Sequence, residues 1–127
     1  MLQRTLTRLP LILIMGTIFF LSHRPGDSFN LPDITDLDKL LHCIAYGVLA
    51  ATALFALEPH FRRSRPWASS LLVVGFCLLY GISDEFHQSF VPGRMPSIWD
   101  IVADVTGALL CVSLWYGIRP KRMTRPV

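Results

Sequence analysis

Residues 67–83 read WASSLLVVGFCLLYGIS and contain no charged side chain. A helix that crosses a membrane needs about 20 mainly apolar residues, because the hydrocarbon layer is about 30 Å thick and a helix rises about 1.5 Å per residue. Continued to Gln88, the stretch reaches this length. It therefore predicts a membrane-spanning helix over residues 67–88.

Similar apolar stretches lie on both sides of this one. They predict further helices over residues 7–22, 38–57 and 98–118. The chain has 127 residues, of which 52% are hydrophobic, and this size fits one domain. We expect an all-α fold, an integral membrane four-helix bundle in which residues 1–127 form a single domain. A soluble four-helix domain is the alternative, and the uncharged run argues against it.

The first stretch has a second interpretation. Arg4 and Arg8, followed by apolar residues 9–21, are also typical of a secretory signal peptide. The next residues, 22–25, read SHRP and lack the small residues that the cleaving peptidase requires. We therefore favour an uncleaved first span.

Four spans divide the charged residues between two sides. The side that holds both termini carries nine of the twelve lysines and arginines, namely Arg4, Arg8, Arg62, Arg63, Arg65, Arg119, Lys121, Arg122 and Arg125. The other side carries eight of the nine acids, namely Asp27, Asp33, Asp36, Asp38, Asp84, Glu85, Asp100 and Asp104. Basic loops stay in the cytoplasm, so we expect an inner-membrane protein with both termini cytoplasmic. The basic surface suits anionic lipid heads and is not interpreted as nucleic-acid binding.

Helical periodicity gathers polar residues at the acidic end of the bundle. On the second expected helix, Asp38, His42 and Tyr46 recur every four residues and share a face, while Lys39 lies about 100° from Asp38. Polar residues inside an apolar span are costly and commonly functional. This stripe is therefore expected to face a site inside the bundle.

The third and fourth expected helices bring carboxylates to the same end. One face of the third helix carries Gly81, Asp84, Glu85 and Gln88. His87 points away from that face. On the fourth helix, Asp100 and Asp104 are in line with Gly107 and Cys111, small residues that allow a neighbouring helix to approach closely.

The connection between these two helices, residues 91–97, reads VPGRMPS. Its proline–glycine pair suits a type II turn. Ser97 is the expected N-cap of the fourth helix, and Asp100 occupies the position of a capping-box glutamate. Arg94 is thereby expected just outside the helix ends, where a guanidinium can bind a carboxylate or a phosphate. The acids within its reach would be Asp84, Glu85 and Asp100.

Three motifs occur in order: Asp38-Lys39-x-x-His42-x-x-x-Tyr46, SDEFHQSFVPGR at residues 83–94, and Asp100-x-x-x-Asp104-x-x-Gly107. Together they resemble the VanZ-like family, a group named for a teicoplanin-resistance protein. The resemblance covers roughly residues 35–118 and implies a multi-pass envelope protein, and some members are linked to glycopeptide tolerance. The family pattern commonly has Asn where this chain has Asp104.

The candidate site supports more than one hypothesis. In the first, the protein acts on a membrane lipid or a lipid-linked cell-wall precursor, and the catalytic residues, which move a proton, are His42, Glu85 and Asp100. The substrate-binding residues are Asp38, Lys39, Tyr46, Gln88, Arg94 and Asp104. The alternative is a binding or sensing protein for an envelope lipid or an antibiotic, without turnover.

Two further interpretations of the same residues stay open. The first is a divalent cation held by Asp100, Glu85 and His42. The second is a purely structural network of ion pairs and hydrogen bonds that joins the helices.

Overall fold

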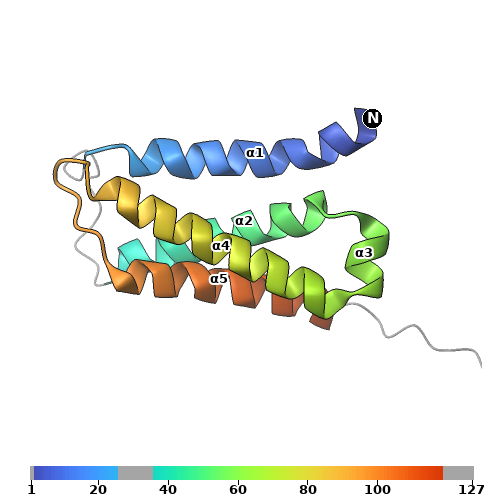
Figure 1. The fold of residues 1–127 in the computed structure, drawn as a ribbon. Coiled ribbons are helices and arrows are strands. Elements are labelled where there is room, and N and C mark those ends of the chain that lie inside the picture. Colours follow the sequence, from blue (N-terminus) through green and yellow to red (C-terminus); the bar gives the residue numbers. More distant parts are fainter. Residues whose placement is uncertain (1, 26–35, 119–127) are drawn as a thin grey trace, which may run out of the picture.

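The computed structural model describes residues 2–25 and 36–118, and all regular structure in them is helical. The helices are α1 (Leu2–Ser22), α2 (Leu37–Ala56), α3 (Pro59–Ser64), α4 (Pro66–Gln88) and α5 (Ile98–Gly117). The four long helices lie side by side as a bundle, and the short α3 lies across one end of it (Figure 1). The prediction of an all-helical membrane bundle is confirmed.

Three of the helices, α2, α4 and α5, are long and apolar enough to cross a membrane, and α1 contains a shorter apolar segment, Leu6–Ser22. Large apolar side chains cover their outer faces. Leu71 is 75% exposed and Leu79 69% exposed. An apolar surface of this extent is unfavourable in water and suits contact with lipid chains.

The long helices begin and end close to the ranges expected from hydropathy. The bounds of α2, α4 and α5 differ from those ranges by at most one residue. Helix α1 begins at Leu2, five residues before the expected 7–22. The apolar run marks the part that lipid can surround, whereas a helix continues into neighbouring polar residues because its backbone bonds do not require apolar side chains.

Helix α3 was not predicted. Its N-cap is Glu58, whose carboxylate accepts hydrogen bonds from the backbone N–H groups of His60 (3.0 Å) and Phe61 (2.7 Å). Pro59 occupies the first helical position, where its missing N–H costs nothing. Glu58, a side chain that can cap a helix, followed directly by Pro59 was the signal for α3 in the sequence.

Arg62 fastens α3 to the rest of the bundle. Its side chain is buried, and Nη1 donates a hydrogen bond of 2.5 Å to the Leu54 carbonyl of α2. The guanidinium carbon lies 5.1 Å from the centroid of the Trp115 ring of α5, within range of a cation–π contact. One basic residue therefore joins three helices at this end.

Helices α2 and α5 pack most closely where small residues meet. Gly107 of α5 lies against the backbone of Cys43, and a Cβ at position 107 would collide with the Cys43 carbonyl. A Cβ on Gly47 would lie 3.5 Å from the Gly107 carbonyl oxygen. The close approach expected at Gly107 is thus observed, and it brings the polar residues of α2 and α5 within bonding distance.

The described charged residues gather at the two ends of the bundle. Arg62, Arg63 and Arg65 lie in or beside α3, at the end where α1 begins (Figure 1). The acids of α2, α4 and α5 lie toward the opposite end, beside the connection between α4 and α5. Some of the residues that predicted the orientation are not covered by the structure. The side chain of Arg4 is not described, and six others lie outside the described residues, namely Asp27, Asp33, Arg119, Lys121, Arg122 and Arg125.

Candidate functional site

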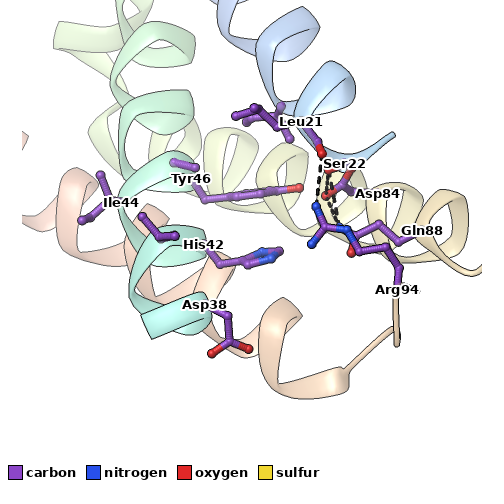
Figure 2. Close-up of a pocket in the computed structure, with 12 residues that line it drawn as sticks. Leu21, Ser22, Asp38, His42, Ile44, Tyr46, Asp84, Gln88 and Arg94 are labelled. Atoms are coloured by element: carbon purple, nitrogen blue, oxygen red, sulfur yellow. Dashed lines mark hydrogen bonds between the residues drawn. The ribbon is translucent and has the colours of Figure 1, made fainter. Parts of the chain in front are cut away.

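A pocket of about 410 Å³ opens at the acidic end, between α1, α2 and α4 (Figure 2). Its polar lining residues are Ser22, Asp38, His42, Tyr46, Asp84, Gln88 and Arg94. The other predicted site residues, Lys39, Glu85, Asp100 and Asp104, are not among its lining residues. Its apolar lining comes from α1 and α2 and includes Ile18, Leu21, Leu41 and Ile44. The pocket therefore combines a charged region with a hydrophobic wall.

His42 and Asp104 form the innermost polar pair of the site. His42 Nδ1 lies 2.9 Å from Asp104 Oδ1, and Asp104 is fully buried. Gly81 makes room for this carboxylate, since a Cβ there would lie 2.7 Å from Asp104 Oδ2. With Asp104 ionised, its carboxylate can only accept hydrogen bonds, so His42 would donate from Nδ1 and keep Nε2 for another partner.

Two further carboxylates face the other side of the His42 ring. Nε2 lies 4.0 Å from Asp100 Oδ2. One ligand atom from each of His42, Glu85 and Asp100 lies within 4.8 Å of the others. Glu85 is 5% exposed and Asp100 7% exposed. Glu85 Oε1 and Asp100 Oδ1 have no hydrogen-bond partner among residues 2–25 and 36–118.

Glu85 also helps to cap the N-terminus of α5. Ser97 is the N-cap, as expected, and its hydroxyl accepts from the Trp99 N–H at 3.2 Å. The backbone N–H of Ser97 donates to Glu85 Oε2 at 2.8 Å, the bond that a capping box would give to Asp100. The capping-box role expected of Asp100 was therefore wrong, and α4 supplies that acceptor instead.

Arg94 connects the loop between α4 and α5 to the end of α1. Gly93 has a φ of 74°, and the Arg94 N–H donates to the Val91 carbonyl at 3.2 Å, which fits the expected type II turn. The Arg94 side chain donates to the carbonyls of Leu21 (3.1 Å) and Arg24 (3.2 Å), as Figure 2 shows in part. Its binding of an acid or an anion stays a prediction.

A protein-family model described as VanZ/LLP1 matches residues 8–119. The chain belongs to the VanZ/LLP1 family. The resemblance inferred from the three sequence motifs is thereby confirmed. No curated protein and no solved structure matches the chain.

In this VanZ/LLP1 protein, Lys39 lies near both Asp38, which lines the pocket, and the buried Asp100. Its Nζ lies 2.9 Å from Asp38 Oδ2 and 3.8 Å from Asp100 Oδ1. The second distance exceeds that of a hydrogen bond. Lys39 and Asp38 thus pair with each other, although they are separated by about 100° around the helix.

A hydrogen-bond cluster at the end of α1 was not predicted. The Ser22 hydroxyl donates to Asp84 Oδ2 at 2.8 Å, and Gln88 Nε2 donates to the same oxygen at 3.0 Å. Tyr46 is buried, and Figure 2 shows its ring pointing across the pocket toward Asp84. Ser22, at the polar end of an otherwise apolar helix, was the only signal in the sequence that α1 contributes a side chain to this cluster.

The VanZ/LLP1 motif residue His87 lies away from this pocket, as expected from its helical position. Its Nε2 is 3.1 Å from Nδ1 of His23, and its ring centroid is 4.8 Å from that of Phe19. His87 therefore belongs to a contact between α1 and α4 that is separate from His42.

Proposed function

We propose that this VanZ/LLP1 protein binds and acts on a membrane lipid or a lipid-linked cell-wall precursor at the extracytoplasmic face of the inner membrane. The observation that carries this proposal is the composition of the pocket. Among its lining residues, Arg94 suits an anionic head group, while the wall from α1 and α2 suits the adjoining apolar chain. An envelope substrate would also connect the protein to glycopeptide tolerance, which some family members are linked to.

The proposed roles follow the positions of the side chains. Arg94 and Lys39 supply positive charge near the head group, and the other substrate-binding residues are Asp38, Tyr46, Gln88 and Asp104. The proposed catalytic residues are His42, Glu85 and Asp100. They converge within reach of one reacting group.

Electrostatics favours turnover over simple binding. Glu85, Asp100 and Asp104 are all buried, and negative charges at this end of the bundle would repel an anionic head group. Burying such groups is also expensive unless they are paired or functional. A site whose only task was to bind an anion would not need them.

The test compares the lipids of cells that lack the protein with those of cells that produce defined variants. Wild type should change the level of a lipid or lipid-linked precursor, and His42→Ala should not, because it removes the imidazole and leaves the helices intact. The matched control is His60→Ala, since His60 is exposed on α3 at the far end.

Full activity of a normally inserted His42→Ala variant would contradict the proposed reactive centre. If wild type carries a lipid through purification yet changes no lipid in cells, the protein binds or senses its ligand without turnover.

The proposed orientation predicts the labelling of introduced cysteines. Met95 is 88% exposed at the acidic end, so Met95→Cys should react with a membrane-impermeant thiol reagent in intact cells that have a permeable outer layer. His60→Cys, at the basic end, should react only after the inner membrane is opened. Wild type, with Cys43, Cys77 and Cys111, measures the background. The reverse labelling pattern would invert the orientation.

A further inference from the structure

We propose that His42, Glu85 and Asp100 bind a divalent transition-metal ion of the Zn²⁺ or Mn²⁺ type. The inference deepens the proposed function, on which it rests for the role of the ion, by assigning a cofactor to the same site. The binding itself follows from the arrangement of these side chains.

The geometry of the three side chains is close to that of a metal site. Nitrogen and oxygen ligands bind Zn²⁺ at about 2.0–2.2 Å, so two ligands of one ion lie about 3–4 Å apart. The distance from His42 Nε2 to Asp100 Oδ2 is 4.0 Å, and the ligand atoms of all three residues lie within 4.8 Å of one another. Side-chain shifts on the order of 1 Å would close the remaining gaps.

Asp104 orients the histidine for this role. Metal-binding histidines usually donate their other ring N–H to a carboxylate or a carbonyl, which fixes the ring and its tautomer. His42 makes this bond from Nδ1 to Asp104 at 2.9 Å. The fully buried Asp104 rests against Gly81 and cannot move freely, so Nε2 is held facing the carboxylates.

Glu85 and Asp100 each present one buried oxygen for which the described part of the chain supplies no hydrogen-bond donor. The Ser97 N–H holds Glu85 Oε2 in place, and Glu85 Oε1 has no hydrogen-bond partner among the described residues. The same is true of Asp100 Oδ1, where the nearest cation, Lys39 Nζ, lies 3.8 Å away and pairs more closely with Asp38. A divalent ion bound through Asp100 Oδ2, the oxygen 4.0 Å from His42 Nε2, and through a Glu85 oxygen would offset the negative charge of both buried carboxylates.

The donor set indicates the class of metal. Carboxylates alone would suit Mg²⁺ or Ca²⁺, but an imidazole nitrogen favours transition metals such as Zn²⁺ and Mn²⁺ over these ions. Three protein ligands are also the number found in catalytic zinc sites, which keep a coordination position for water or substrate. Of the three ligands, His42 also lines the pocket, so an ion bound here would lie beside it.

The test measures metal binding by the full chain, purified in detergent without a polyhistidine tag and stripped of metal. Zn²⁺ and Mn²⁺ are titrated separately, with Mg²⁺ as competitor, and bound metal is counted by elemental analysis. Wild type should bind one ion per chain. Asp100→Asn should bind at least about 10-fold more weakly, because even changes outside the ligand set cost about 10- to 100-fold in affinity.

Asp36→Asn is the matched control, because Asp36 is an exposed acid at the same end and its loss should leave the affinity unchanged. If Asp100→Asn does not fold, His42→Gln provides the same comparison. Wild type that binds neither Zn²⁺ nor Mn²⁺, or equal affinities in wild type and the folded site variants, would overturn the inference.

The two proposals fail in different ways. Wild type that changes lipids in cells but binds neither Zn²⁺ nor Mn²⁺ after purification would overturn the metal site and leave the proposed function standing. One bound ion per chain, lost in Asp100→Asn, together with unchanged lipids in cells, would overturn the proposed function and support the metal site.

Discussion

Gly107→Ala is expected to separate α2 from α5 and to lower the free energy of unfolding by about 3 kcal/mol or more, the upper range for overpacked cores. The added Cβ would collide with the Cys43 carbonyl. Because this obstacle is backbone, no side-chain rotation can relieve the collision, and one helix must move. Such a movement would also draw Asp104, one turn away, from His42. Thermal unfolding in detergent measures the loss of stability.

Gly75→Ala is the matched control for this prediction. It makes the same chemical change within a helix, but no heavy atom lies within 4 Å of the added Cβ. Alanine is favoured over glycine inside a helix by about 0.5–1 kcal/mol, so this variant should be as stable as wild type or slightly more stable. Equal unfolding temperatures for the two variants would show that α2 and α5 do not depend on their contact at Gly107.

Asp104→Leu is expected to reduce the proposed lipid conversion by about 10- to 100-fold, the usual cost of losing the group that orients a metal-binding histidine. Leucine has a similar size but cannot accept the hydrogen bond from His42 Nδ1. The imidazole would lose its fixed orientation toward Glu85 and Asp100. Conversion rates of purified protein, and the affinity for Zn²⁺, both measure this effect.

Asp104→Asn separates hydrogen bonding from charge at this position. An amide oxygen can still accept from His42 Nδ1, so the loss should be smaller than that of Asp104→Leu. Equal losses in both variants would mean that the carboxylate acts through its charge. Full activity of Asp104→Leu would show that His42 needs no orienting partner.

The sequence predicted the long helices because a single physical requirement, the thickness of the membrane, sets their length. The positions of the charged residues along each stretch predicted which end of the bundle is polar, and the four-residue spacing of Asp38, His42 and Tyr46 predicted the polar face of α2. Such a pattern assigns a residue to a helix face but does not assign its partner. That His42 bonds to Asp104, 62 residues away, depends on how closely α2 and α5 pack.

The interactions that the sequence did not reveal are those between separate segments. Ser22 and Asp84 meet only because α1 lies against α4, and Ser97 meets Glu85 only because the intervening connection turns back. The capping-box pattern predicted that Asp100 accepts the hydrogen bond of the Ser97 N–H, because this pattern considers only residues of the same helix. The short α3 was missed because its six residues carry no long apolar pattern.

Glu85 forms part of two structures at once, the start of α5 and the charged cluster around His42. A replacement must therefore satisfy two independent requirements, one for helix capping and one for the arrangement of the charged cluster. Loss of function after mutation of Glu85 would have two causes that a single assay cannot separate. Few residue types can therefore replace Glu85. Asp100 does not accept the Ser97 N–H, so substitutions of Asp100 report on the cluster more directly.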